Sequence, residues 1–396
     1  MKRDAARDGK AGGSLLSGPV MLLALAALAS IAGFQVLLSV VPLYAEASGG
    51  GPAGAGLATA SFMASTVLAQ VTMPAVLGRF GYRKVLVAGV LFLGLPAFLY
   101  PLAGGLVGIL AVTLARGVGF GVVTVAFIAL IVGLAPPGRR GEAFGLVGVA
   151  MTLPTIFGNP LGLWLVDASG YAAVFLLGGV LPLLSLAAMA RIGTGVPDRP
   201  ESGGAGFLDG LGRAELLRLL VIFATSTSAS GVMVTFLPLA LPAAGLFSPA
   251  TAILAFGVAS TVSRLWAGRF GDRRDPHLLL APGLVVAACG VAALPLGGPA
   301  MVAGALLFGG GAGLLQNATL MLTMDRVAEG ERGLGSTLWN VAFDAGTGMG
   351  AFAFGLVVGA TGYAFAFYLS AAILLAAIVL VFVDRRSVNK PPRSDP

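Results

Sequence analysis

Long apolar stretches constrain this chain more than any other feature. Twelve of them follow one another along the 396 residues, each with almost no charge and each close to the roughly 20 residues that a helix needs to cross a bilayer. Charged residues make up only 10% of the chain, against roughly 25% in soluble domains. The chain is therefore expected to be an all-α integral membrane protein with twelve transmembrane helices.

The expected boundaries of these helices come from the apolar runs alone. The first run is too long for a cleaved signal peptide and counts as a membrane helix. Two of the later separations are short glycine turns, at 104–105 and 297–299. The expected spans are residues 18–45, 54–77, 85–103, 106–135, 143–166, 172–192, 214–244, 248–267, 277–296, 299–324, 334–360 and 362–383.

Positive charge is confined to one side of the expected membrane. All but two of the 24 Lys and Arg residues fall in segments that the twelve crossings place on the side of the N-terminus. Cytoplasmic loops collect Lys and Arg, so both termini are expected to be cytoplasmic, in a multi-pass protein of the bacterial plasma membrane. The basic residues lie in short scattered loops, which suit anionic lipids of the bilayer and not nucleic acid. The exceptions are Arg116 and Arg264, inside apolar helices.

The chain also repeats itself at an offset close to 192 residues. The segment 168–172, A-S-G-Y-A, recurs as A-T-G-Y-A at 360–364, and four further pairs follow in the same order. The repeat predicts two pseudo-symmetric six-helix bundles. The expected organisation is an N-terminal tail 1–17, a first bundle 18–192, a cytoplasmic linker 193–213 with a short interfacial helix at its end, a second bundle 214–383 and a C-terminal tail 384–396.

Two six-helix halves related as parallel repeats resemble the major facilitator superfamily. The loop 78–84 reads G-R-F-G-Y-R-K and the loop 268–274 reads G-R-F-G-D-R-R, and both are similar to the signature loop of that superfamily. Only the second copy keeps the acidic residue. The resemblance implies a gating role for Gly78, Arg79, Gly81, Arg83, Gly268, Arg269, Asp272 and Arg273.

Two further motifs resemble those of export proteins within the superfamily. Gly158, Pro160 and Gly162 are similar to a degenerate form of the helix-5 element of antiporters. The run F-D-A-G-T-G-M-G at 343–350 resembles bacterial drug and arabinose-efflux-type permeases, including metallophore exporters. The resemblance implies a transporter that exports a small molecule.

Two embedded charges break the internal symmetry and are the best candidates for proton coupling. Arg116 matches Phe308 in the other half, and Asp344 matches Thr152. Each lies ten residues into its helix, about 15 Å deep at 1.5 Å per residue, near the middle of the bilayer. Asp344 could carry the transported proton, or the two could form a structural ion pair. Arg264 is close enough to a helix end to reach the cytoplasmic surface, so a structural role is expected.

Polar residues on the expected inner helices predict a cavity of hydroxyls and amides. Such a cavity suits a neutral, weakly charged or amphipathic solute. A Ser or Thr hydroxyl can instead bond to the backbone of its own helix. The cavity candidates are Gln35, Ser39, Thr124, Thr227, Ser230, Gln316, Asn317 and Asn340.

The function expected from these features is secondary active transport. The main hypothesis is proton-coupled antiport that exports a small organic molecule by alternating access. The alternatives are a proton symporter or uniporter importing a sugar-like nutrient, and a non-transporting receptor or scaffold. The sequence shows no phosphate-binding loop, nucleophile–base set or metal-ligand cluster, so no enzyme activity, cofactor or metal is expected. A monomer is expected, with a small molecule, protons and the bilayer as partners.

Overall fold

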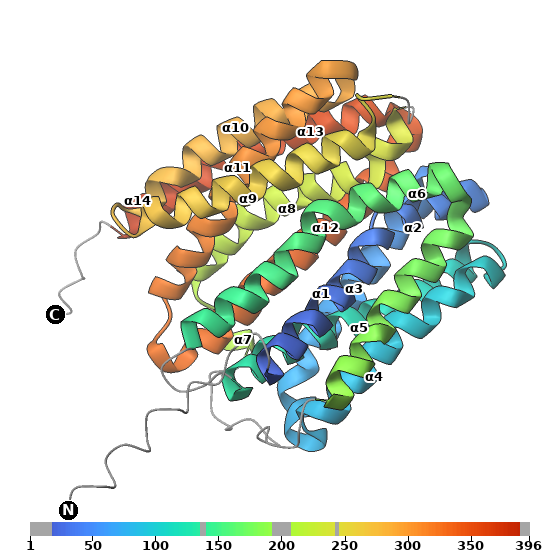
Figure 1. The fold of residues 1–396 in the computed structure, drawn as a ribbon. Helices are drawn as coiled ribbons and strands as arrows, with labels where there is room; N and C mark the ends of the chain where they lie inside the picture. The colour runs from blue at the N-terminus through green and yellow to red at the C-terminus, as the bar shows by residue number, and fades with distance from the viewer. Residues whose placement is uncertain (1–17, 135–139, 192–206, 242–244, 389–396) are drawn as a thin grey trace, which may run out of the picture.

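The computed structural model describes residues 18–134, 140–191, 207–241 and 245–388, which form two helical halves (Figure 1). The expectations for the tail 1–17, for residues 193–206 of the linker and for residues 389–396 lie outside the described residues. The first half contains α1 (Pro19–Leu37), α2 (Val40–Ala45), α3 (Gly51–Phe80), α4 (Tyr82–Gly94), α5 (Gly105–Leu134) and α6 (Arg140–Arg191), with a π-helical turn at Glu46–Gly50 and a 3-10 segment at Leu95–Leu102.

The second half follows the same order of long helices. Its α7 is the short helix expected at the end of the linker, and it ends before the next crossing begins. The helices are α7 (Phe207–Leu211), α8 (Ala214–Ala240), α9 (Pro249–Gly271), α10 (Leu280–Ala293), α11 (Gly298–Asp325), α12 (Arg332–Thr361), α13 (Tyr363–Ala376) and α14 (Ile378–Val388), with 3-10 segments at Pro276–Leu279, Leu294–Leu296 and Glu329–Glu331.

Among the described residues, ten helical stretches are long and apolar enough to cross a membrane. Two of these, of 62 and 47 residues, each hold two crossings, which brings ten to the predicted twelve. Gly49, with a φ of 91°, breaks the first, and Gly170, with a φ of 77°, breaks the second. Glycine adopts a positive φ without the steric cost that a Cβ imposes. The predicted fold class is confirmed.

One helix extends past an expected boundary. The sequence places residues 384–396 in a tail, because charge begins at Asp384. In the structure α14 continues to Val388, and Asp384 is fully buried. Its charge is accommodated by basic partners from other helices, which a hydropathy pattern along one segment does not reveal.

Glycines at repeat-related positions pack the helices of the two halves in the same way. A Cβ at Gly117 would collide with the backbone of Phe62 on α3, and one at Gly309 with the backbone of Phe256 on α9. Such close approach is what small residues permit in membrane bundles. Gly162 meets α1 at Val36 in the same manner. The matched glycines Gly117 and Gly309 therefore serve the packing of the helices.

The two halves meet along a seam in which α3 lies against α12. At one end, a Cβ at Gly56 would fall 2.4 Å from the Ala351 carbonyl oxygen and 3.0 Å from Gly355. Nearby, the hydroxyls of Thr59 and Thr235 lie 2.8 Å apart across the seam. The halves are therefore in direct contact at this end of the molecule.

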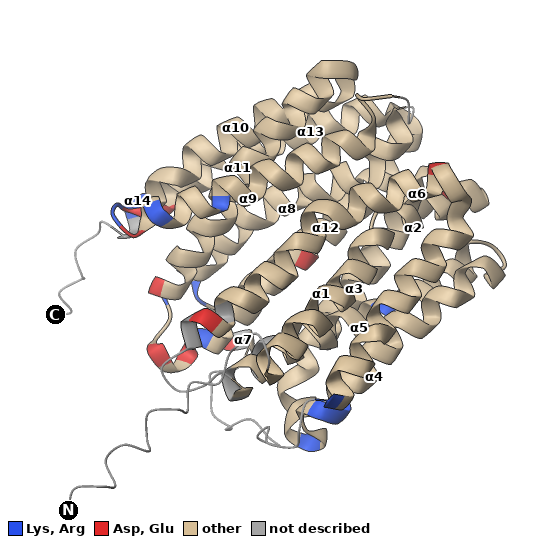
Figure 2. Cartoon of the chain, in the orientation of Figure 1, with Lys and Arg blue, Asp and Glu red and all other residues tan. Residues whose placement is uncertain are grey.

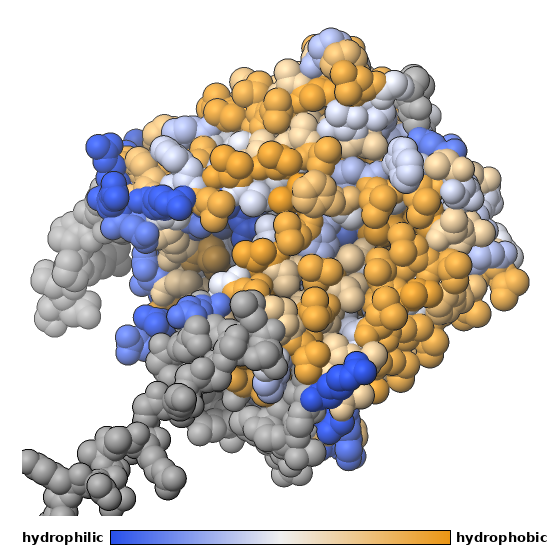
Figure 3. Space-filling model, in the orientation of Figure 1, coloured by the Kyte–Doolittle hydropathy of each residue, from blue (hydrophilic) through white to orange (hydrophobic). Residues whose placement is uncertain are grey.

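Basic residues gather at the other end (Figure 2). They lie at the α3–α4 junction, at the end of α9 and in α14, and we call this the basic end. The face between the two ends carries broad apolar areas (Figure 3). Exposed apolar side chains such as Leu68, Trp164 and Leu356 belong to long helices of both halves. This surface suits the hydrocarbon interior of a bilayer.

Candidate functional site

A cavity of about 170 Å³, here called the central cavity, lies between the two halves. Helices α1, α3 and α6 line it from the first half, and α8, α9, α11 and α12 line it from the second. Four aromatic side chains lie on its wall: Phe34, Phe223, Phe256 and Phe343. Because both halves contribute, movement of one half against the other changes the shape and exposure of this cavity.

Four of the eight predicted cavity residues line the central cavity. They are Gln35, Thr227, Ser230 and Gln316. They come from α1, α8 and α11, so the structure brings together polar groups that are far apart in the sequence.

The other four predicted residues do not line it. Ser39 is fully buried and donates to the Val234 carbonyl, 2.5 Å away across the seam. Thr124 and Asn340 donate to carbonyls of the preceding turn of their own helices. Asn317 keeps a buried carbonyl oxygen that has no hydrogen-bond donor within the described residues. These four residues were predicted from their polarity and their position along the helices. They lie on helix faces that do not line the central cavity.

Sequence reasoning missed a polar face of α9. Gly257, Ser260, Thr261 and Arg264 all line the cavity. Their spacing of three, four and seven residues is that of one helix face, a signal present in the sequence. Three further polar lining residues were missed, Thr155, Asn159 and Thr347.

The hydroxyls and the amides of this wall differ in their hydrogen bonding. Thr227, Thr261 and Thr347 donate to carbonyls of their own helices. The oxygen of the Asn159 amide is buried and has no partner among the described residues, and this side chain is only 3% exposed. Buried polar groups are rarely left unpaired in native proteins. These three hydroxyl donors are therefore already engaged, whereas the Asn159 oxygen has no partner among the described residues.

Among the described residues that line the central cavity, Arg264 is the one with a charged side chain. It lies on α9, and no described residue forms an ion pair or hydrogen bond with its guanidinium. Its place near a helix end predicted a structural role at the surface. The structure instead places it in the cavity wall, where its charge can act on the contents of the cavity.

Asp344 lies in the seam between the halves. It is on α12, is 5% exposed, and its Oδ2 accepts a hydrogen bond of 2.8 Å from Gln70 Nε2 on α3. The other polar atom of that amide, Gln70 Oε1, is buried without a partner in the described chain. The contact therefore joins the two halves through a single bond to a buried carboxyl.

Arg116 is not the partner of Asp344. Its guanidinium, 1% exposed, donates to the carbonyls of Leu93 and Gly33 at 3.1 and 3.4 Å and lies near the Tyr100 hydroxyl. The rings of Phe62 and Tyr100 lie 5.9 and 5.7 Å from it, which suits cation–π attraction. The expectation of an ion pair is wrong, because all these partners belong to the first half. Arg116 joins α1, α4 and α5 there.

The glycines of the two signature loops and of the motif at 158–162 on α6 act mainly through the backbone, as turns or as points of close helix packing. Gly81, with a φ of 77°, ends α3 and begins α4. Arg79 stacks on Phe80, and the exposed side chain of Asp272 has no ionic partner within the described chain. On α6, Gly158 and Gly162 admit α1 at close range, with Pro160 between them. The two signature loops, Gly78 to Arg83 and Gly268 to Arg273, both lie at the basic end, and their gating role stays a prediction.

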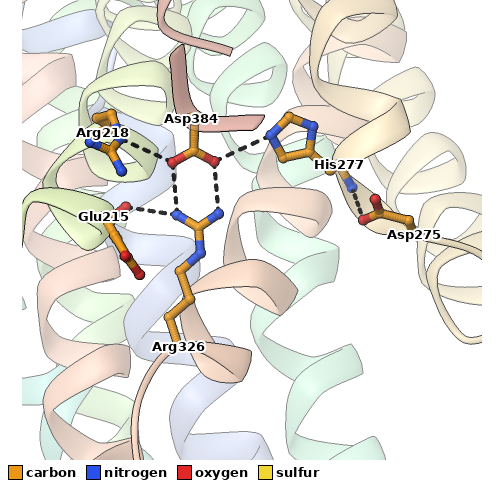
Figure 4. Close-up of polar contacts among 6 residues, drawn as sticks. All are labelled: Glu215, Arg218, Asp275, His277, Arg326 and Asp384. Carbon is orange, nitrogen blue, oxygen red and sulfur yellow. Dashed lines mark hydrogen bonds and ion pairs between the residues drawn. The ribbon is translucent and has the colours of Figure 1, made fainter. Parts of the chain in front are cut away.

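A second buried carboxyl lies at the basic end, inside the second half (Figure 4). Arg326 binds Asp384 with two hydrogen bonds of 2.7 and 3.0 Å. Arg218 Nε lies 3.1 Å and His277 Nε2 3.2 Å from the same carboxyl. These partners come from α8, the residue that follows α11 and the segment before α10, so Asp384 joins four parts of one half.

The chemistry of these sites is that of binding and of proton exchange. No group of three or more His, Cys, Asp or Glu residues that could hold a metal ion occurs in the described part of the chain. The central cavity offers aromatic rings, amides and one guanidinium, and the seam offers one buried carboxyl.

Comparisons with solved structures show the same fold. A nucleoside transporter aligns with a TM-score of 0.75 and 13% identity, covering 94% of this chain and all of that chain. A bacterial homologue of the human lysosomal transporter Spinster, in an inward-facing and occupied conformation, also gives 0.75, with 14% identity over 94% of this chain and 98% of the other. At such identities the likeness shows the fold alone.

Sequence comparison adds a relative that matches part of the chain, and a family. A multidrug resistance protein B homologue of Mycobacterium tuberculosis is 26% identical over 202 residues, which are 51% of this chain and 30% of that protein. The chain thus matches less than a third of the length of this relative. The sequence pattern of the Major Facilitator Superfamily matches residues 23–330 and 298–396. The chain belongs to the Major Facilitator Superfamily.

Proposed function

We propose that this transporter exports a small organic molecule in exchange for protons, and that Asp344 carries the proton. The observation that carries the proposal is the bond between Asp344 and Gln70. It joins a buried carboxyl of the second half to an amide of the first half. This bond lies away from the end of the molecule at which Gly56 and Gly355 are in contact, and Asp344 is near the middle of α12.

The bond links the protonation of Asp344 to the relative position of the halves. Gln70 donates to a carboxylate oxygen, so the contact is a charge-assisted hydrogen bond when Asp344 is ionised. Rocking of α12 against α3 changes this contact, and protonation changes its strength. A proton gradient can drive a transport cycle only if the proton binds the two conformations with different affinity. A buried carboxyl held from one half by a donor on the other meets that requirement.

Export is favoured over import by the relatives. The Mycobacterium tuberculosis protein is named for multidrug resistance, and the run at 343–350 resembles that of efflux-type permeases. The proposal places both termini on the cytoplasmic side of the plasma membrane. Labelling of Ala205→Cys in a protein lacking Cys289, by an impermeant reagent outside intact cells, would contradict that orientation.

The test uses purified protein in liposomes with an imposed pH gradient and a panel of radiolabelled organic compounds. Wild-type protein should move at least one compound against its concentration gradient, in the direction opposite to the proton. Asp344→Asn should abolish pH-driven movement and leave binding of that compound measurable, because the titratable group is gone while the central cavity is intact.

Asp167→Asn is the matched control. Asp167 is exposed on α6, next to the Gly170 break. Its replacement by asparagine removes the same charge at a position outside the seam. It should transport like the wild type. Full pH-driven transport by Asp344→Asn would show that another group carries the proton. Movement of the compound with the proton would replace export by symport.

A further inference from the structure

The central cavity contains an uncompensated positive charge. Arg264 lines it, and no described side chain pairs with the guanidinium by a hydrogen bond or an ion pair. Arg116, the other embedded cation, donates to two carbonyls and lies between aromatic rings. The two arginines therefore differ in the property that matters for a ligand, because only Arg264 retains its full set of donors.

The rest of the wall indicates the body of the molecule. Phe34 from the first half and Phe223, Phe256 and Phe343 from the second contribute aromatic surface. Aromatic rings pack well against other rings and against apolar chains. The Asn159 amide belongs to the same wall, and its buried oxygen has no partner among the described residues. The lining thus combines a large apolar area with one cation and a few amides, as small-molecule sites commonly do.

We infer that the substrate is a small monoanionic organic acid with an aromatic or apolar body, whose carboxylate binds Arg264. One guanidinium presents a planar pair of donors that matches a carboxylate, and it balances one negative charge. The cavity of about 170 Å³ excludes bulky ligands in this conformation. This inference rests on the proposed transport function, since it names the substrate class of the same cavity.

The test compares three probes of the same shape: 3-phenylpropionate, its neutral amide and 3-phenylpropylamine. Binding to purified full-length protein in lipid nanodiscs is measured by equilibrium dialysis at pH 7.5. The carboxylate should bind about 10- to 150-fold more tightly than the amide, as expected for a hydrogen bond to a charged group. The ammonium probe should bind more weakly still, because Arg264 repels it.

Variants assign the preference to the residue. Arg264→Gln should remove the preference for the carboxylate over the amide, and Arg264→Lys should keep part of it. Arg386→Gln removes the same charge from an exposed position at the end of α14, outside the cavity, and should bind all three probes like the wild type. The comparison of the three probes on the wild-type protein needs no variant. It therefore still tests the inference if Arg264→Gln folds poorly.

The possible outcomes separate this inference from the proposed function. Equal binding of the three probes, binding of none, or an unchanged preference in Arg264→Gln overturns the assignment of an organic acid. If pH-driven export of a neutral or cationic compound is then found, the transport proposal stands alone. If the carboxylate preference depends on Arg264 but no probe is transported under a pH gradient, the binding site stands and proton-driven export fails.

Discussion

Replacing Gly56 by valine should open the seam at the end away from the basic loops. A Cβ at this position would lie 2.4 Å from the Ala351 carbonyl oxygen, 0.6 Å short of the 3.0 Å below which real Cβ contacts essentially do not occur. The conflicting atoms are backbone, so no side chain can turn aside. The two extra methyl groups of valine add to the conflict, and only separation of α3 from α12 relieves it.

The expected size follows from the cost of overpacking. Extra volume in a tight contact costs about 1–3 kcal/mol. The conflict exists only while the seam is closed, so this cost is a difference between the closed and open conformations. At about 1.4 kcal/mol for each factor of ten, the equilibrium should move about 5- to 150-fold toward the open form.

The assay is the labelling rate of a reporter cysteine. Thr235 is fully buried in the closed seam, facing Thr59, so the cysteine of Thr235→Cys reacts only when the seam opens. In a protein lacking Cys289, Gly56→Val should raise its rate of reaction with a bulky maleimide by the factor above. Pro52 and Gly355 lie on the same contact, so Gly355→Val should act in the same direction.

Gly359→Val is the control, because it adds the same side chain to α12 where no atom lies within 4 Å of the new Cβ. Its labelling rate should equal that of the parent protein. A folded Gly56→Val protein that is labelled no faster than this control would refute the reasoning, since the closed seam would then not depend on the backbone contact.

Three further predictions concern the buried charges and the signature loop at 268–274. Asp384→Asn should lower the free energy of unfolding by about 3–5 kcal/mol, because breaking a buried pair leaves basic groups without a counter-charge. Thermal unfolding of the purified protein measures this loss, and an unchanged midpoint would contradict it. Arg116→Gln should lower stability through its unpaired carbonyls, by about 1–3 kcal/mol each, yet keep pH-driven transport per folded molecule, and a specific loss of coupling would return Arg116 to the proton pathway. Asp272→Asn should slow transport more than Asp167→Asn at equal expression if the signature loop closes the basic end in another conformation; equal rates would exclude such a latch.

The crossings and the internal repeat could be predicted because both depend on properties read along one segment. Length and apolar character fix a membrane span. The glycine turns at Gly105 and Gly297 were short but decisive, since both have positive φ in the structure. The matching of Gly117 with Gly309 also carried information about packing, because repeated helices need the same close approach.

The partners of the embedded charges could not be predicted in the same way. Position in a helix gives depth, so Arg116 and Asp344 were rightly placed near the middle of their helices. Depth is one coordinate, and pairing also depends on the face of the helix and on its neighbours. Arg116 faces carbonyls within its own half, and Asp344 faces Gln70. Arg264 was misjudged for the converse reason, since nearness to a helix end does not exclude a side chain from the cavity wall.

The distribution of charge between the halves has a consequence for coupling. The first half presents neutral amides, Gln70 to the seam and Asn159 to the cavity, whereas the second half presents the charges, Asp344 and Arg264. Under the repeat, those two charges match Thr152 and Pro74, so the first half has no equivalents. A proton on Asp344 and an anion on Arg264 would therefore both be bound to the second half. Each would alter how the second half contacts the amides of the first half. Two ligands that bias one shared two-state movement must influence each other's binding, and that reciprocal influence is what links the export of a substrate to the entry of a proton.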